Sequence, residues 1–417
     1  MSKERDIDNR ADNPGAVIVD GHGHTDLGVI RALGKAGVPV YLLSDKPQTA
    51  ARYSRYVELF SDFPAGNAGE LERVKALREF GRRFRHKPVL FSTGDSTLML
   101  FSRHRAALEH YYRHHLAETQ LVEQLYDKQL FARLAGQLQL PIPATVAPRS
   151  REDLEAALWG MRFPVIVKPA EKRCWAIYPQ VVELVDGNPK GVRIDTRRQL
   201  LRFYDTVTSY NNRLIIQEYI EGRDELLYSL YAYIDRRHHV KAWGLSQKIR
   251  TNPPHRGVAT FSVTRTERAI CRMGLSVLNT LGVTGLAILQ VKWSARHNDY
   301  LLLEINPRHG TSIGLYPSAG VNLPYVAYRD SLCHALPDQP EQREGVRWAD
   351  WAGDMRALRS YQALGEWRWP GFLRSYFGAR TYAVFDWRDP LPWVLPLWQR
   401  VRRKSAKLAH RKGGYAK

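Results

Sequence analysis

Apolar runs alternate with polar turns along the first third of the chain, in the order expected for a parallel sheet. The run AVIVD at 16–20 predicts a strand, a glycine-containing turn follows it, and apolar residues recur at helical spacing over 27–33. Gly37 ends this predicted helix, and VPVYLL predicts the next strand. A further strand at 88–92 runs into the polar residues TGDS, at the kind of strand end where crevices form. The pattern predicts a Rossmann-like α/β domain.

The turn after the first strand contains Gly21, Gly23 and Gly28, in the spacing GxGxxxxG. A dinucleotide-binding turn has the spacing GxGxxG, because its glycines meet the pyrophosphate and the helix at fixed positions. The observed spacing therefore favours a tight turn into a helix over NAD binding. Asp26 and the nearby histidines remain candidates to face a small polar substrate.

Later apolar strands end in charged or amide residues. The strand in FPVIVKP ends in Lys168, and the strand at 213–217 leads into EYIEG. Another strand, at 284–293, forms a hairpin with one that ends in Glu304-Ile305-Asn306. Side chains two residues apart on a strand point to the same face, so Glu304 and Asn306 are expected to converge.

The composition is that of a folded protein, with 44% hydrophobic and 25% charged residues. A chain of 417 residues predicts about two to four domains. Its cysteines, Cys174, Cys271 and Cys333, are too scattered to predict disulfides or a thiolate metal site. The first ten residues lack the apolar core of a signal peptide, and no apolar run approaches the roughly 20 residues of a spanning helix. A cytoplasmic location is therefore expected.

The formal charge of +20 raises the question of nucleic-acid binding. Arginines are spread through every segment, however, and the only sustained basic block follows Arg400. Because no nucleic-acid motif accompanies the charge, a general affinity for anions is expected rather than a nucleic-acid partner. A ribosome-associated or nucleic-acid-binding protein remains a rival hypothesis.

Several segments together carry the pattern of a known family. They are Asp127-Lys128, the VIVKP strand, QEYIEG and LLLEINPRHG, in that order along the chain. In order and rough spacing they resemble the ATP-grasp superfamily. The stretches KPAEKRCW, SQKIRTNPPHRGVAT and EINPRHGTSIGLYPSAGVNLP more closely resemble carboxylate–amine ligases similar to D-aspartate ligase. The resemblance covers about residues 16–335.

The resemblance implies an α/β chain in which a Rossmann-like pre-ATP-grasp domain precedes a two-lobed ATP-grasp fold. The implied divisions are 14–120 for this first domain, 121–220 for the small lobe with its lid, 221–338 for the large lobe with the metal site, and 339–417 for a C-terminal extension. The resemblance also implies ATP and Mg²⁺ as cofactors, with a small-molecule carboxylate and an amine as substrates. Nothing in the sequence indicates an oligomeric state.

The resemblance also implies a nucleotide site. Lys128 and Lys168 would approach the triphosphate, and two ammonium groups from different segments suit its negative charge. A hinge would offer backbone groups and the Glu218 carboxylate to the adenine edge, and Glu225 would accept the ribose hydroxyls. The implied nucleotide-binding residues are Lys128, Lys168, Gln217, Glu218, Tyr219, Ile220, Glu225 and Lys248.

The implied magnesium ligands are Gln290, Glu304 and Asn306, whose oxygens suit a hard cation. Many family members have Glu or Asp where this chain has Gln290, so the neutral amide weakens one metal position. His255 and His309 lie in predicted loops, where a solvent-exposed histidine is more common than a ligand or a base.

The implied catalytic residues are Arg308, Lys168 and Arg250. Arg308 would stabilise the transferring phosphoryl group, and Arg250 would hold phosphate or the substrate carboxylate, since guanidinium binds both through its fork. The segment after Lys168 departs from the family, because it reads AEKRCWAIYPQ where many members have glycines that fold over the phosphates. Lys172 and Arg173 are candidates to replace them.

The resemblance implies a ligase that converts a carboxylate to an acylphosphate, releases ADP and lets an amine displace phosphate. Amino acids, dipeptides and uronic or muramyl sugars all remain possible substrates. The alternative is an ATP-binding regulatory or scaffold module without ligase activity, which Gln290 and the glycine-poor segment motivate.

The end of the chain is rich in tryptophan and basic residues. Seven of the eleven tryptophans follow residue 340, and the chain finishes with PLPWVLPLWQRVRRKSAKLAHRK before its last residues. This pattern suits a peripheral contact with the inner face of a membrane or with an anionic polymer. The alternative is a C-terminal subdomain packed on the ligase core with a frayed basic tail.

Overall fold

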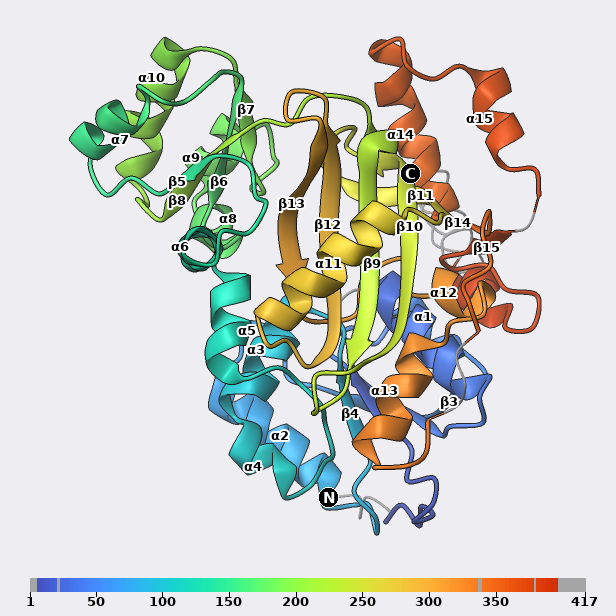
Figure 1. Ribbon diagram of the computed structural model, residues 1–417. Coiled ribbons are helices and arrows are strands. Elements are labelled where there is room, and N and C mark those ends of the chain that lie inside the picture. The colour runs from blue at the N-terminus through green and yellow to red at the C-terminus, as the bar shows by residue number, and fades with distance from the viewer. Residues whose placement is uncertain (1–5, 21–22, 337–339, 379, 397–417) are drawn as a thin grey trace, which may run out of the picture.

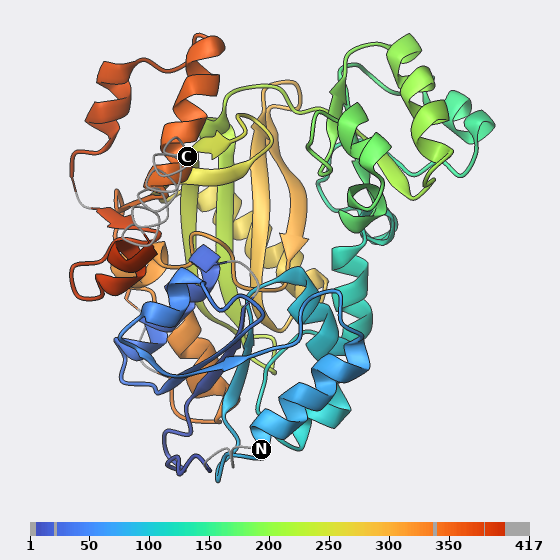
Figure 2. The same ribbon diagram turned by 180° about the vertical axis from the view of Figure 1, so that it is seen from behind.

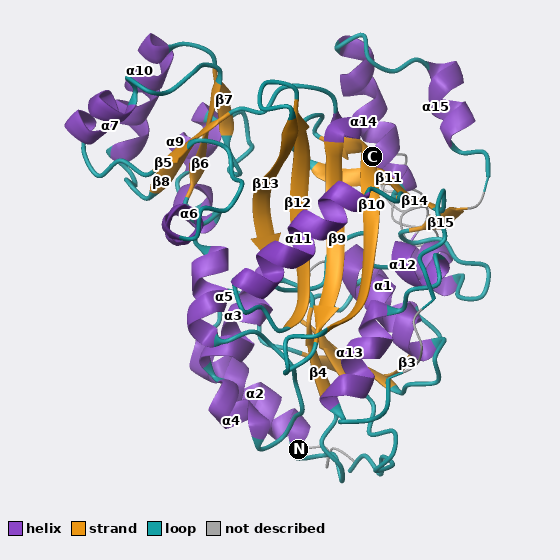
Figure 3. Ribbon diagram, in the orientation of Figure 1, coloured by secondary structure: helices purple, strands orange, loops and turns teal. Residues whose placement is uncertain are grey.

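The computed structural model describes residues 6–20, 23–336, 340–378 and 380–396 (Figure 1). Three sheets organise these residues, and helices pack on their faces (Figure 3). No helix in this part of the chain is long and apolar enough to cross a membrane. The basic tail from residue 397 onward lies outside the described residues, as do Gly21 and His22.

The N-terminal domain is a parallel sheet with helices on its faces. Its elements are β1 (Ala16–Val19), α1 (Gly23–Gly34), β2 (Val40–Ser44), η1 (Ala50–Tyr53), β3 (Val57–Asp62), α2 (Glu70–Gly81), β4 (Val89–Ser92), α3 (Asp95–Arg103) and α4 (Arg105–Glu109). The strand order is β3-β2-β1-β4. Strands β1, β2 and β4 are buried along their whole length, as expected for parallel strands covered on both faces.

A small lobe follows and stands apart from the other sheets (Figure 1). Its elements and the two helices that lead to it are α5 (Thr119–Tyr126), α6 (Lys128–Gln137), β5 (Thr145–Val146), α7 (Arg151–Ala157), β6 (Val165–Pro169), α8 (Arg173–Ala176), α9 (Pro179–Leu184), β7 (Val192–Ile194), α10 (Arg197–Thr208) and β8 (Leu214–Glu218). The antiparallel strand order is β5-β8-β6-β7. Trp175 fills the core beneath the helices.

The central sheet forms the largest lobe. Its first elements are η2 (Asp224–Leu226), β9 (Leu227–Ile234), β10 (Val240–Asn252), β11 (Val258–Thr264), α11 (Arg268–Thr280), β12 (Gly285–Ser294), β13 (Asp299–Asn306), α12 (Leu315–Ser318) and α13 (Leu323–Ser331). Along β9, Leu230 and Ala232 pack under α11, whereas Tyr231 and Tyr233 join a core shared with the N-terminal sheet. Figure 2 shows the N-terminal domain across the lower part of this second face.

The C-terminal region continues the central sheet. It contains β14 (Arg347–Ala349), α14 (Trp351–Ala363), α15 (Trp369–Ser375) and β15 (Arg380–Tyr382). Strand β14 pairs antiparallel with β11, and β15 pairs parallel with β14, which gives the order β13-β12-β9-β10-β11-β14-β15. The sheet therefore contains strands from both sides of residue 338, where the predicted large lobe ends and the predicted C-terminal extension begins.

The segment after β15 is fastened to the N-terminal domain through Asp389. This carboxylate is fully buried and accepts hydrogen bonds from Arg31 Nε at 2.9 Å, Ser54 Oγ at 2.7 Å and the Arg55 amide at 2.8 Å. Arg31 lies on α1. The C-terminal region thus contacts both the central sheet and the N-terminal domain.

Candidate active site

Neighbouring strands bring together the three residues predicted to bind magnesium. In the β12–β13 hairpin, Gln290 lies opposite Glu304 and Ile288 lies opposite Asn306. The Asn306 amide donates to Glu304 Oε1 at 3.2 Å, and Ser229 Oγ donates to Gln290 Oε1 at 3.0 Å. The Glu304 carboxylate is open to solvent. Three oxygen-bearing side chains therefore lie side by side on the sheet.

Three lysines from different elements surround the Glu304 carboxylate. Lys128 begins α6, Lys168 lies on β6 and Lys248 lies on β10. Desolvation by the surrounding protein raises the pKa of Glu304, but the positive charges of these lysines outweigh it and hold the pKa below its ordinary value. One carboxylate among several ammonium groups is an arrangement that matches a triphosphate with its divalent cation.

Lys168 is positioned by the small-lobe sheet, in which β6 pairs with β8. Its Nζ donates to Gln217 Oε1 at 2.9 Å. Burial lowers the pKa of Lys168 to about 8, with Glu304 acting against this change and Lys128 adding to it. The ammonium is therefore held at a position where a bound phosphate would stabilise its charge.

Lys190 belongs to the same group of charges and was not predicted from the sequence. Burial lowers its pKa, and the charges of Glu304 and Asp95 act against that change. A Cβ on the next residue, Gly191, would lie 3.0 Å from Lys168 Cγ, so the turn before β7 packs directly on Lys168. A lysine in an NPKG turn looks like an ordinary solvated residue, and only the pairing of β6 with β7 reveals its position.

Arg308 joins the central sheet to the N-terminal domain. Its guanidinium forms an ion pair with Asp95, the first residue of α3, and donates to the His309 carbonyl at 3.0 Å. Burial lowers the pKa of Arg308, but Asp95 and then Glu304 raise it overall. The site therefore lies where the carboxyl end of β4 meets the end of β13.

The predicted adenine hinge lies at the end of β8, in the residues Gln217, Glu218, Tyr219 and Ile220. The buried Glu218 carboxylate pairs with Arg296 at 2.7 Å and with His297 at 3.4 Å, both in the β12–β13 turn. Its contact with the adenine edge stays a prediction. Glu225 lies in η2 and pairs with Arg223 at 3.2 Å.

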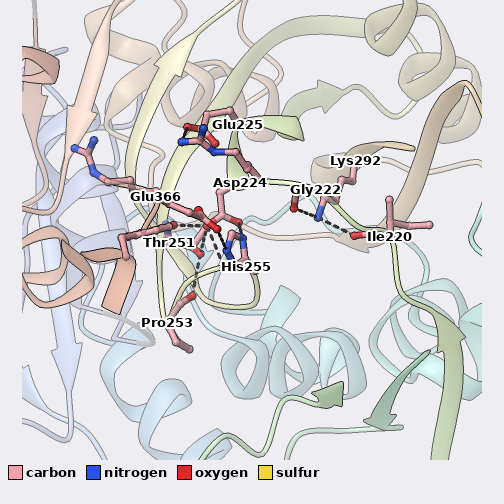
Figure 4. Close-up of polar contacts among 12 residues, drawn as sticks. Ile220, Gly222, Asp224, Glu225, Thr251, Pro253, His255, Lys292 and Glu366 are labelled. Carbon is pink, nitrogen blue, oxygen red and sulfur yellow. Dashed lines mark hydrogen bonds and ion pairs between the residues drawn. The ribbon is translucent and has the colours of Figure 1, made fainter. Parts of the chain in front are cut away.

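Lys292 supports the hinge and was also not predicted from the sequence. It lies on β12 with 3% of its surface exposed, and its Nζ donates to the Ile220 carbonyl at 2.8 Å and to the Gly222 carbonyl at 2.9 Å (Figure 4). Burial lowers the pKa of Lys292 to about 8, against the attraction of Asp224 and Glu221. A buried ammonium therefore fixes the backbone directly after the hinge.

Arg250 lies outside this site, which corrects its predicted catalytic role. Its fully buried guanidinium donates to Asp354 at 2.8 and 2.6 Å and lies 4.5 Å from the rings of Phe261 and Trp367. The physical reason is a β-bulge between Lys248 and Arg250. On a regular strand these two residues would share a face, whereas the extra residue turns Arg250 away from Lys248. Arg250 therefore holds the C-terminal region on β10.

The glycine-poor segment after Lys168 is folded into the small lobe. It forms α8 and the start of α9, with Trp175 fully buried and Arg173 paired to Glu171 at 2.9 Å. The Arg173 side chain remains largely exposed in this ion pair, and its role in covering the phosphates stays a prediction. Lys172 keeps a place near the site, because its charge acts on Lys190.

The donor set fits a magnesium ion carried by a nucleotide. Among the described residues, no group of three or more His, Cys, Asp or Glu side chains is placed to hold a metal ion. Only Glu304 of the three predicted ligands is acidic, and Gln290 and Asn306 contribute amide oxygens. Mg²⁺ accepts such hard donors and in nucleotide sites keeps phosphate and water as most of its ligands.

Known proteins are similar to the chain in sequence and in fold. A family model described as ATP-grasp in the biosynthetic pathway with Ter operon matches residues 247–353. The curated D-aspartate ligase of Enterococcus faecium is 28% identical over 256 residues, which cover 59% of this chain and 59% of the relative. The match thus spans less than two thirds of that relative's length.

Solved structures share the fold at low sequence identity. The L-amino acid ligase from Bacillus licheniformis is 16% identical with a TM-score of 0.59, over 82% of this chain and 78% of that one. The biotin carboxylase from Campylobacter jejuni, solved with β,γ-ATP, is 12% identical with a TM-score of 0.62, over 80% of this chain and 74% of that one. The chain therefore has the fold of these solved structures, and parts of its sequence are similar to the ATP-grasp family model and to a D-aspartate ligase.

Proposed function

We propose that the protein is an ATP- and Mg²⁺-dependent carboxylate–amine ligase, which forms an amide through an acylphosphate and releases ADP and phosphate. The observation that carries this proposal is the position of Glu304 among Lys128, Lys168 and Lys248, beside Asn306. The lysines match the phosphates, and the carboxylate and amide match their cation. The printed names of two relatives, a D-aspartate ligase and an L-amino acid ligase, support the choice of reaction.

In the first step, a carboxylate oxygen of the substrate attacks the γ-phosphorus of ATP. A new O–P bond forms while the bond to the bridging β-phosphate oxygen breaks, and ADP leaves. Lys128 and Lys168 neutralise phosphate oxygens, and Arg308, already oriented by Asp95, stabilises charge on the transferring group. Magnesium held by Glu304 and its two amide neighbours would supply further charge neutralisation at the phosphates.

In the second step, the amine nitrogen attacks the acyl carbon, the C–O bond to phosphate breaks, and the nitrogen loses a proton. No protein nucleophile is needed, because catalysis of this kind depends on positioning and on charge stabilisation. The names of the relatives favour an amino acid as one substrate. Dipeptides and acidic sugars of the cell envelope remain alternatives.

Trapping with hydroxylamine tests the proposal. The protein would be incubated with ATP, Mg²⁺, hydroxylamine and a panel of carboxylates that includes D- and L-amino acids. We expect a hydroxamate to form with equal amounts of ADP and phosphate, and Glu304→Ala to suppress it because the cation loses its only acidic ligand. Release of AMP and pyrophosphate would exclude this class of reaction.

A second candidate function is an ATP-binding regulatory module without ligase activity, which the neutral Gln290 and the folded segment after Lys168 favour. The Gln290→Glu variant separates the two. In a ligase it should lower the Mg²⁺ concentration needed for half-maximal activity, because a carboxylate attracts a dication more than an amide does. Tight ATP binding without nucleotide cleavage across the whole panel would favour the regulatory module.

A further inference from the structure

The loop between β10 and β11 is built around His255 and a buried carboxylate. Asp224 Oδ2 accepts hydrogen bonds from Thr251 Oγ1 at 2.8 Å, from the His255 amide at 3.0 Å and from the Tyr361 hydroxyl (Figure 4). His255 Nδ1 lies 3.7 Å from Asp224 Oδ1, and His255 Nε2 lies 2.8 Å from Glu366 Oε1. His255 is therefore hydrogen-bonded to Glu366 of the C-terminal region and lies within ion-pair distance of Asp224 of η2.

The two ends of the loop pair with each other, and its backbone has little freedom to change conformation. Asn252 pairs with Val258, and a Cβ on Gly257 would lie 2.1 Å from the Asn252 carbonyl oxygen, so only glycine fits there. His255 has a φ of 63°, in the left-handed region that non-glycine residues rarely adopt. Such a conformation persists when surrounding contacts over-determine it, and it is found most often at functional sites.

This loop lies beside the proposed nucleotide hinge. Asp224, which binds the loop, directly precedes Glu225, and its charge also attracts the ammonium of Lys292. Burial raises the pKa of Tyr219, while the positive charge of Arg256, the residue after His255, acts against that rise. Asp224 therefore binds the loop, directly precedes the residue predicted to meet the ribose, and acts by its charge on Tyr219 of the hinge and on Lys292 behind it.

We propose that His255 is a positioning residue, which holds the β10–β11 loop against the nucleotide hinge with the help of Glu366 and Tyr361. The proposal rests on the proposed nucleotide site and gives the C-terminal region a part in nucleotide binding. An imidazolium donates a charge-assisted hydrogen bond to Glu366 and is attracted by the Asp224 carboxylate, whereas a neutral ring has no charge to strengthen either contact. The strength of the contact therefore follows the charge of His255.

The expected pH dependence of nucleotide affinity has a defined sign. The Asp224 carboxylate is the largest cause that raises the pKa of His255, burial acts against it, and Glu366 adds to the rise. The groups that face the ring are Asp224 from η2, and Tyr361 and Glu366 from the C-terminal region. The imidazolium that pairs with both carboxylates is present below the raised pKa and is lost as the pH rises through it, so nucleotide affinity should fall over that range.

Titration with the Mg²⁺ complex of adenosine 5′-(β,γ-imido)triphosphate tests the proposal without requiring turnover. At a pH below the pKa of His255, His255→Ala should raise the Kd about tenfold, as for the loss of a charge-assisted hydrogen bond. Glu366→Gln should move the pH dependence of the Kd to lower pH. The control is His239→Ala, because His239 faces Asp235 at 3.6 Å but lies in the exposed β9–β10 turn, and it should change neither quantity.

Thermal unfolding of each variant distinguishes positioning from general loss of structure. Wild-type affinity in a folded His255→Ala variant would overturn the proposal. If His255→Ala fails to fold, Glu366→Gln decides, since it keeps the shape of the side chain, and an unshifted pH dependence would overturn the proposal. Failure of the wild-type protein to bind the analogue would remove the nucleotide site itself, an outcome distinct from normal binding that ignores His255.

Discussion

Among single residues, Lys168 is expected to favour ATP binding while lowering the stability of the nucleotide-free protein. Its folded pKa of about 8 lies below the ordinary lysine value of about 10.4, so the unfolded chain binds more protons between these values. The stability of the nucleotide-free protein should therefore rise with pH across this window. Lys168→Met should reduce that rise, to which Lys292 contributes over the same window, and should abolish measurable ATP affinity near pH 7. Urea unfolding at several pH values and calorimetric titration would check both, and unchanged affinity would remove Lys168 from the site.

Arg250 provides the opposite test, because the structure assigns it to packing. Its side chain and that of Asp354 are both fully buried. Arg250→Met leaves the Asp354 carboxylate uncompensated and should lower the free energy of unfolding by about 3–5 kcal/mol. Nucleotide affinity of the folded fraction should persist, and Arg250→Met with Asp354→Leu should recover much of the stability. A variant of normal stability that had lost nucleotide affinity would return Arg250 to the site.

Lys292 is expected to serve both nucleotide binding and stability, because its ammonium fixes the backbone of the hinge region and does not itself contact the ligand. Lys292→Met leaves the carbonyls of Ile220 and Gly222 without their donor, so the hinge should lose its fixed shape. We expect weaker binding of an ATP analogue, measured by calorimetry, together with a lower unfolding temperature. Lys241→Met is the control, because Lys241 pairs with Asp235 at the partly exposed end of β10. Equal effects of both substitutions would contradict a specific role at the hinge.

At the scale of elements, the strands with continuous apolar runs were predictable from the sequence. Strands β1, β4 and β6 and the β12–β13 hairpin are confirmed. Strand β3 escaped prediction because it lies at a sheet edge and is only partly buried. Glu304 and Asn306 were predictable because they follow strand periodicity. Arg250 was not, because a bulge breaks that periodicity, and Lys190 and Lys292 depend on contacts between segments distant in the sequence.

The segment after β15 should stabilise the N-terminal domain through Asp389. Asp389→Ala leaves the largely buried Arg31 without its counter-charge, so we expect a loss of about 3–5 kcal/mol and faster hydrogen exchange in α1 than in α11. Asp386→Ala is the matched control, because Asp386 pairs with the exposed Lys35 at 2.6 Å. An exposed pair of this kind should cost only about 0–1 kcal/mol. Similar losses in both variants would contradict a special role for Asp389.

At the scale of the whole molecule, the proposed site is assembled from separate units that must be held in register. The small lobe contributes Lys168, the central sheet contributes Glu304 and Arg308, and the N-terminal domain contributes Asp95. Part of the net charge of +20 gathers near Glu304, because cations from different units meet there. A bound polyanion would relieve their mutual repulsion, whereas an empty site would not.

The Arg308–Asp95 pair is the direct test of this assembly, because it crosses from the central sheet to the N-terminal domain. Asp95→Asn keeps the size of the side chain but removes the charge that orients Arg308. If Arg308 meets the transferring phosphoryl group, the rate of hydroxamate formation should fall by about a hundredfold, as for loss of a preorganised transition-state donor. The Kd for an ATP analogue should change little, since the phosphates of the ground state keep Lys128 and Lys168. Equal losses in rate and in nucleotide affinity would mean that Asp95 acts on nucleotide binding instead.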